Sequence, residues 1–338
     1  MNQNHQFTAR PTAENTTVVL QGPVLRNEPT GRNETATIVR KLREVLPDSK
    51  LVLSTWEGED TAEIDVDHVI SSEDPGGLAF HNYNIVNNVN RQILSTIRGL
   101  KAVDTPFAIK LRTDQGLQDS RVLNLFGREK ERSESFRIFR ERIIIPSIYT
   151  RNPSRYDLPL LFHPSDMFQF GLTADLIHLW DIDLCDLEEN NYYFLRNPRP
   201  DFDPRPIWTN QFAPEQYIWR SCIRKTHDMQ FDHAWDVRGE NPEISRLSLV
   251  NNFKVLSAGR IGLVNHKRVW PPYNLQLTLY TEGDWLKDYH RYCCGRSQWI
   301  FDGHRWSLRF RWLISFIEHW ISGVRIRLGA YRQKFSNR

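Results

Sequence analysis

The sequence has few cysteines and no long apolar run, and both absences narrow the kind of protein it encodes. Four cysteines include an adjacent pair but no CxxC spacing, so neither a disulfide framework nor a zinc site is expected. The apolar stretch 312–324 is interrupted by Glu318 and His319 and is too short to cross a bilayer. Residues 1–17 are polar and lack the features of a secretory signal. We therefore expect a cytoplasmic protein that does not span the membrane.

Several catalytic motifs are also missing from the sequence. It contains no GxGxxG, Walker or GxSxG motif, and its eleven histidines show no HExxH spacing. These absences argue against dinucleotide oxidoreductases, P-loop hydrolases, serine hydrolases and His-based metal sites. The formal net charge of +3 is too small to suggest nucleic-acid binding. A chain of 338 residues fits one large α/β unit with an appendage.

Strand and helix patterns alternate over the first third of the chain. Short apolar runs at 16–25, 50–58, 67–77 and 106–114 predict strands, and apolar residues at helical spacing in 30–49 and 82–100 predict helices. Parallel neighbours need such crossover helices, so the pattern predicts a mostly parallel sheet covered on both faces. Ligands of these sheets collect at the carboxyl ends of the strands. Four polar or turn-forming segments stand there: Gln21-Gly22-Pro23, Ser54-Thr55-Trp56, Glu73-Asp74-Pro75 and Arg112-Thr113-Asp114.

The stretch KLRTDQG carries the most specific chemistry among these ends. Lys110, Arg112 and Asp114 alternate along an extended chain and would share one face. A carboxylate there can hold a divalent cation against a diphosphate, and the two cations add positive potential. The alternative is an ordinary salt-bridged strand end.

Two further segments could approach a ligand. Gly22 and Pro23 permit close backbone approach after the first strand, or form an ordinary turn. Asn87, Asn88, Asn90 and Arg91 fall within the expected helix at 82–100, where asparagine is unfavourable. They could present amides and a guanidinium to a sugar or phosphate, or they could cap adjacent loops.

Two carboxylates are candidates for a general base. Asp166 stands at the mouth of a short strand, and Glu215 lies in the first turn of a helix that begins near Pro214. Either could deprotonate an acceptor hydroxyl. For Glu215 the alternative is a simple favourable interaction with the helix dipole. The segment 190–213, rich in Asn, Pro and aromatics, is expected to be a loop that acts as a lid or faces the acceptor.

The C-terminal stretch 304–335 interleaves Trp, Phe, Leu and Ile with Arg and Lys, and Glu318 is its only acidic residue. This mixture is typical of a helix that binds a membrane surface, with apolar rings at the acyl boundary and cations on anionic headgroups. The alternative is a helix that docks on its own domain.

Taken together, LQGP, STWEG, EDPGG, NNVNRQILSTIRGLKAV and KLRTD, in this order and spacing, resemble the WavE family associated with lipopolysaccharide synthesis, whose members resemble GT-A glycosyltransferases. The resemblance is densest over 16–118 and continues through SDMFQFG and PEQYIW. It implies a GT-A-like α/β fold, with a mostly parallel central sheet flanked by helices and a helical C-terminal appendage. The divisions we expect are a flexible N-terminus at 1–14, a transferase domain at 15–265 and a membrane-associating tail at 266–338.

The resemblance also implies an activity and its partners. The chain would move a sugar from a nucleotide-sugar donor to a lipid-linked or lipopolysaccharide acceptor, at the cytoplasmic face of the inner membrane and without nucleic acid. The alternatives are a non-catalytic assembly protein at the membrane surface and a nucleotidyltransferase of polysaccharide synthesis.

The site residues follow from the segments described above and from the same resemblance. Those expected to hold the nucleotide sugar are Gln21, Gly22, Pro23, Trp56, Asp74, Asn88, Arg91, Lys110 and Arg112, with Glu215 or Asp166 as the catalytic base. Asp114 stands where the DxD motif of GT-A enzymes binds Mn²⁺ or Mg²⁺. Position 112 is Arg in this chain, so only one carboxylate of that motif is present, and Arg112 could itself supply charge to a departing diphosphate.

Overall fold

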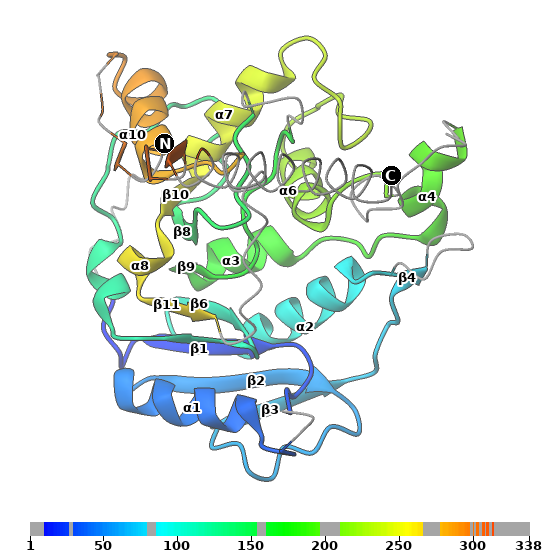
Figure 1. Ribbon diagram of the computed structural model, residues 1–338, viewed down its shortest axis with the longest axis vertical. Helices are drawn as coiled ribbons and strands as arrows, with labels where there is room; N and C mark the ends of the chain where they lie inside the picture. The colour runs from blue at the N-terminus through cyan, green and yellow to red at the C-terminus, as the bar shows by residue number, and fades with distance from the viewer. Residues whose placement is uncertain are drawn as a thin grey trace, which may run out of the picture.

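Seven strands form the central sheet of the protein (Figure 1), and their order is β10-β8-β9-β6-β1-β2-β3. The computed structural model describes residues 10–26, 30–79, 86–153, 160–196, 210–265 and 278–297, with scattered positions from 300 to 313. The strands are β1 (Thr16–Gln21), β2 (Lys50–Trp56), β3 (His68–Ser72), β6 (Phe107–Arg112), β8 (Ile143–Pro146), β9 (Gln169–Leu172) and β10 (Phe253–Leu256). Strand β9 pairs antiparallel with β6 and β8, whereas the other pairs are parallel. The mostly parallel α/β sheet predicted from the sequence is confirmed and is consistent with a GT-A-like fold.

Helices cover both faces of this sheet because successive residues of its buried strands point to opposite sides. Val18 and Leu20 of β1 join a core with α1 (Glu34–Val45), whereas Val19 joins a second core with α2 (Val89–Lys101). The second core extends over α3 (Thr173–Trp180), α6 (Pro214–Arg224), α7 (Asn241–Asn252) and α10 (Glu282–Asp288). With both faces covered, the strand ends are left as the accessible edge.

Shorter elements border the sheet. They are the strand pairs β4 (Leu78–Ala79) with β5 (Val86–Asn87) and β7 (Gln115–Leu117) with β11 (Leu263–Asn265), the helices α4 (Leu187–Arg196) and α8 (Ala258–Ile261), and the helical turns η1 (Arg121–Leu125) and η2 (Tyr289–Cys293). The prediction of a loop over 190–213 is wrong for its first residues, because α4 continues to Arg196. Residues 197–209 lie outside the described part of the chain.

Helix α2 begins later than the sequence pattern predicts. Asn88 is its N-cap, and Asn87 belongs to β5, so neither lies within the helix. The side-chain oxygen of Asn87 accepts a hydrogen bond from the backbone N–H of Val89 at 3.0 Å. Such local side-chain bonds compete with helical backbone bonds and favour a helix start. Residues 80–85, which open the predicted helix, lie outside the described residues.

Part of the segment assigned to the tail packs on the sheet domain. Tyr280, Trp285 and Tyr289 are at most 5% exposed and belong to the same core as α2. The indole N–H of Trp285 donates to the carbonyl of Phe253 in β10 at 2.7 Å. The domain boundaries expected after residues 14 and 265 stay predictions. Within the described residues, no helix combines the length and the apolar character needed to cross a bilayer.

Candidate active site at the carboxyl edge of the sheet

The ends of β1 and β6 meet through their backbones at the centre of the edge. The N–H of Thr113 donates to the carbonyl of Gln21 at 3.1 Å, and the N–H of Gly22 donates to the carbonyl of Ser54 at 3.0 Å. Gly22 has φ +117°, and a Cβ there would lie 3.3 Å from Oγ1 of Thr113. Only glycine adopts this conformation readily, so the close approach of the two strand ends requires Gly22. The exposed Pro23 follows it directly.

The N-terminal half of α2 contacts the end of β1. The hydroxyl of Ser95 lies 2.7 Å from the side-chain oxygen of Gln21 and 2.6 Å from the carbonyl oxygen of Arg91. Arg91 in turn forms a two-pronged ion pair with Asp74, in which Nε–Oδ1 and Nη2–Oδ2 are both 2.7 Å. Hydrogen bonding to Arg91 lowers the pKa of Asp74. Both side chains are more than a third exposed, so a ligand anion can compete for Arg91.

The asparagines around Arg91 divide into two groups. The Asn88 side chain accepts from Nη1 of Arg91 at 2.9 Å and so faces the edge. Asn90 instead pairs with both backbone groups of Cys185, at 2.7 and 2.8 Å, and Asn87 donates to Asn190 at 2.8 Å. Asn90 therefore fixes the loop at Cys185, as the alternative interpretation predicted, whereas Asn87 connects β5 to α4.

Arg112 and Asp114 form a fork at the end of β6. Nε–Oδ1 is 3.1 Å and Nη2–Oδ2 is 3.2 Å, and only 8% of the Asp114 side chain is exposed. Although burial opposes its charge, the pKa of Arg112 is raised, because Asp114 and Asp166 lie close by. About a third of the Arg112 side chain remains exposed, so its guanidinium can also contact a ligand.

Lys110 precedes Arg112 by two residues in β6 and is completely buried. Its ammonium donates to the backbone carbonyl of Asp166 and lies 4.9 Å from the ring centroid of Trp180. Burial lowers the pKa of Lys110 to about 8, and the nearby carboxylates act in the opposite direction. Lys110 therefore holds the backbone of Asp166 and does not present its charge to solvent.

A buried acid–base group completes the site. Oε2 of Glu215 lies 3.5 Å from Nε2 of His163, and the two side chains are 14% and 5% exposed. Burial, and after it the charge of Asp166, raises the pKa of Glu215 to about 8. Burial, helped by Arg151, lowers the pKa of His163 to about 3, so His163 is neutral at physiological pH. A carboxyl group with a raised pKa in a charged pocket is typical of general acid–base sites.

Asp166 lies close to Glu215 and belongs to the segment that leads into β9. Its Oδ2 is buried and accepts no hydrogen bond from any described residue. The ring atom Nδ1 of His163 is buried and unpartnered in the same sense. The charge of Asp166 is one of the causes that raise the pKa of Glu215, so the two carboxyl groups act on one another.

Three residues of this site were not predicted from the sequence: Tyr149, Arg151 and His163. Tyr149 has φ +64°, which is uncommon for an aromatic residue, and its ring centroid lies 5.9 Å from Cζ of Arg151. Arg151 donates to Oγ1 of Thr278 at 2.7 Å. The only sequence signal for them was the polar break directly after the apolar run 143–146 and the His163-Pro164 step before Asp166.

Trp56 lies at the end of β2 and is 8% exposed. A chain of contacts runs from Asp74 and Arg91 through Ser95 and Gln21 to Thr113, the residue between Arg112 and Asp114. Glu215 and Asp166 lie at the other end of that chain, beside Lys110.

The residues at Asp114 do not fit a divalent cation held by protein ligands alone. The structure supplies one carboxylate, and Arg112 already occupies both of its oxygens. Among the residues whose positions the structure describes, no three or more His, Cys, Asp or Glu side chains are grouped to hold a metal ion.

Comparison with known proteins supports the resemblance drawn from the motifs. Residues 16–312 match the family model described as WavE lipopolysaccharide synthesis. No curated protein matches the chain. Because the family match covers well over half of the sequence, this protein belongs to the WavE lipopolysaccharide synthesis family and has a role in lipopolysaccharide synthesis.

Proposed function

We propose that the protein is a glycosyltransferase that moves a sugar from a nucleoside diphosphate donor to a lipopolysaccharide or another surface-glycan acceptor. The observation that carries this proposal is the combination of partly exposed guanidinium groups and a buried carboxyl group of raised pKa at one sheet edge. Guanidinium groups recognise diphosphates through paired hydrogen bonds, and the carboxyl group can accept a proton from an attacking hydroxyl.

In the reaction we propose, the acceptor hydroxyl attacks the anomeric carbon of the donor sugar. A new carbon–oxygen bond forms as the bond to the diphosphate breaks, and the hydroxyl proton passes to Glu215 or Asp166. The nucleoside diphosphate leaves with the bonding electrons, and Arg91 and Arg112 stabilise its negative charge. Lys110 contributes by holding the backbone of Asp166 in place.

Product analysis with a panel of sugar nucleotides tests this function. We expect a hit in a thermal-shift screen, because a ligand that binds the folded state raises apparent stability, and release of a nucleoside diphosphate from the same donor. Release of pyrophosphate would instead identify a nucleotidyltransferase, and the absence of any bound nucleotide would favour the assembly protein. Since Arg112 occupies Asp114, we expect transfer to persist in EDTA; complete loss that added Mn²⁺ restores would contradict this part of the proposal.

We also propose that the C-terminal segment binds the cytoplasmic surface of the inner membrane. Trp306, Phe310 and Leu313 are helical residues at spacings of four and three, and they are 59%, 64% and 46% exposed. Spacings of this kind place side chains on one helix face. The surrounding sequence supplies arginines that match anionic lipid headgroups.

Vesicle co-sedimentation tests the membrane proposal. The full chain is expected to bind vesicles that contain anionic phospholipid, and the double variant W306S/F310S is expected to lose about tenfold in binding because buried ring area at the lipid boundary supplies the affinity. Val69→Ser, which removes an exposed apolar residue of β3, serves as the control and should bind normally. Equal binding by the double variant and the control would remove this helix face from the membrane contact.

A further inference from the structure

Arg151 is a buried arginine that two distant segments of the chain hold in place. Only 8% of the residue is exposed. Its backbone N–H donates to the carbonyl of His163 at 3.0 Å. It also forms an antiparallel bridge with Leu279, and its Nη1 donates to Oγ1 of Thr278 at 2.7 Å. Both the backbone and the guanidinium of Arg151 are therefore fixed.

The backbone is strained beside Arg151 and beside His163. Tyr149 and Phe162 have φ +64° and +52°, values that are uncommon for residues other than glycine. Tyr149 precedes Arg151 by two residues, and Phe162 directly precedes His163. The N–H of Phe162 donates to Oγ of Ser245 in α7 at 2.8 Å. Strained residues persist only where the surrounding structure fixes them, and they cluster at functional sites.

The start of α6, which carries Glu215, is joined to the same segments. The side chain of Gln216 is completely buried, and its amide nitrogen donates to the carbonyls of Leu161 at 2.9 Å and Ala234 at 3.0 Å. Leu161 precedes His163 by two residues. Gln216 therefore fixes the segment before His163 against the helical turn that carries Glu215.

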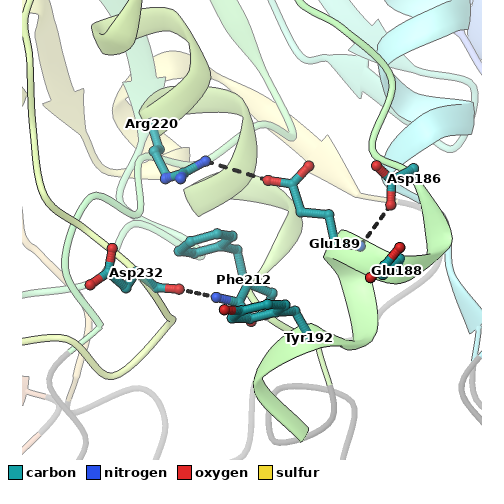
Figure 2. Close-up of a pocket in the computed structure, with 8 residues that line it drawn as sticks. Asp186, Glu188, Glu189, Tyr192, Phe212, Arg220 and Asp232 are labelled. Atoms are coloured by element: carbon teal, nitrogen blue, oxygen red, sulfur yellow. Dashed lines mark hydrogen bonds and ion pairs between the residues drawn. The ribbon is translucent and has the colours of Figure 1, made fainter. Parts of the chain in front are cut away.

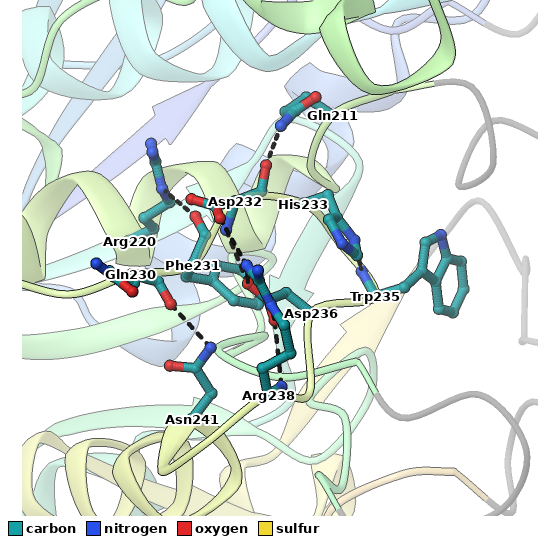
Figure 3. A network of polar contacts seen from close by, with 10 residues as sticks. All are labelled: Gln211, Arg220, Gln230, Phe231, Asp232, His233, Trp235, Asp236, Arg238 and Asn241. Carbon is teal, nitrogen blue, oxygen red and sulfur yellow. Dashed lines mark hydrogen bonds and ion pairs between the residues drawn. The ribbon is translucent and has the colours of Figure 1, made fainter. Parts of the chain in front are cut away.

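Two further contacts hold α6 and its neighbouring loop. Arg220 of α6 lies 3.6 Å from Glu189 of α4, in the wall of a pocket (Figure 2). The loop before α7 is held by Arg238, whose Nη2 lies 2.6 Å from Asp232 and 2.7 Å from Asp236 (Figure 3). Neither contact involves the segments that hold the buried guanidinium, so α6 should keep its position when that group is replaced.

Several titratable groups lie close to Glu215. Nε2 of His163 lies 3.5 Å from its Oε2. The others that interact with its charge are Asp166, Lys110, Arg112, Tyr149 and Arg151. Burial and Asp166 raise the pKa of Glu215, whereas Arg151 and Arg112 act in the opposite direction. Arg151 also helps burial to lower the pKa of His163, so it acts on both members of the pair.

We propose that Arg151 is a positioning residue of the transfer reaction, whose fixed cation stabilises the proton-accepting form of Glu215 and keeps His163 neutral. A neutral imidazole leaves Glu215 as the basic group, whereas an imidazolium would pair with the carboxylate and weaken it as a base. Arg112 is more exposed and can contact the donor, whereas Arg151 acts through Glu215. This inference rests on the proposed transferase function, in which Glu215 accepts the proton of the acceptor.

Titration of the Glu215 carboxyl group tests the inference without turnover. Infrared spectra of the full chain, with those of the matching Glu215→Gln variant subtracted, follow the protonated carboxyl group, whose midpoint in wild type should lie near pH 8. Arg151→Met should raise this midpoint by about one pH unit, because a nearby opposite charge favours the ionised form. Arg151→Lys keeps the charge and should stay close to wild type.

The pH profile of turnover gives an independent readout. At about pH 7, Arg151→Met should be about tenfold slower than wild type, because one unit of pKa changes the ionised fraction about tenfold there. The variant should approach the wild-type rate at high pH, where Glu215 is ionised in both proteins. Damage to the structure alone would lower turnover at every pH.

Two further variants complete the test. Arg142→Met is the matched control and should leave the midpoint unchanged, because Arg142 is also buried, at 6% exposure, and its Nε donates to the carbonyl of Val250. Thr278→Val removes an acceptor of the Arg151 guanidinium and should raise the midpoint by less than Arg151→Met does.

An unchanged midpoint in Arg151→Met, or an equal shift in Arg142→Met, would overturn the proposal. Thr278→Val decides in the same way if Arg151→Met does not fold. The expected shift in a protein that turns over no sugar nucleotide would support the action of Arg151 on Glu215 and contradict the proposed transferase function.

Discussion

Glu215→Gln is expected to lower turnover by about 10²–10⁴-fold, the usual contribution of a general base. The amide has nearly the shape of a protonated carboxyl group and keeps the neighbourhood of His163 filled, but it cannot accept the proton of the acceptor hydroxyl. Donor binding should stay within about threefold of wild type in the thermal-shift measurement, because the nucleotide contacts lie elsewhere along the edge. Near-normal turnover in this variant would assign the base to Asp166.

The pH profile gives this prediction a second readout. Because burial and Asp166 raise the pKa of Glu215 to about 8, wild-type activity should increase with pH and reach half of its maximum near 8. The residual activity of Glu215→Gln should lack that rising limb. Glu34→Gln is the matched control, since Glu34 is also an acidic residue in the first turn of a helix. If interaction with the helix dipole were the only role of Glu215, the two variants would behave alike.

The same carboxyl group should also affect stability, with the opposite dependence on pH. Its ordinary pKa is 4.5 and its pKa in the folded protein is about 8, so between these values the unfolded chain releases a proton that the folded chain keeps. Stability from this group is therefore complete below about pH 4.5 and decreases as the pH rises towards 8. Urea unfolding at pH 5 and pH 8 should show Glu215→Gln gaining relative to wild type at the higher pH.

The fold was predictable because its signals are local. Buried strands such as β1 and β6 read as short apolar runs, and the crossover pattern between them implies parallel pairing, which places Gly22 and Asp114 at one edge. The roles of the side chains around α2 were harder to predict from the sequence. Asn88 and Asn90 are both asparagines near the start of α2. Asn88 accepts a hydrogen bond from Arg91, whereas Asn90 hydrogen-bonds to Cys185, which lies ninety-five residues away.

The acid–base residues of the site show a different limit of prediction from the sequence. Glu215 and Asp166 could be named as candidates, but the raised pKa of Glu215 depends on burial and on the charges of other segments. His163 and Arg151 enter the site from segments without a recognisable pattern, and their positions follow from long-range contacts such as the one between Arg151 and Thr278. These pKa values and positions depend on tertiary packing, so they could not be predicted from the pattern of a single sequence.

Arg112→Ala is expected to lower turnover by about 10²–10³-fold, because it removes a preorganised cation from the point where negative charge develops on the leaving diphosphate. Arg112→Lys should recover only part of this loss, since an ammonium group keeps the charge but cannot form the two-pronged contact with Asp114. Asp114→Asn should also lose activity, because the amide no longer fixes the guanidinium.

The chain offers a matched control for this change in Arg121. Its Nε lies 2.7 Å from Oδ1 of Asp119, two positions away, and its Nη2 contacts Oδ2, but Arg121 is exposed and lies beyond β7. Arg121→Ala removes the same kind of ion pair and should leave turnover unchanged, because a surface ion pair contributes little to stability. A loss of turnover in Arg112→Ala alone would therefore result from the position of Arg112 at the site. A deficit in kcat with an unchanged KM would place the interaction of Arg112 in the transition state. Normal kcat in Arg112→Ala would mean that Arg91, released from Asp74, carries the charge of the diphosphate alone.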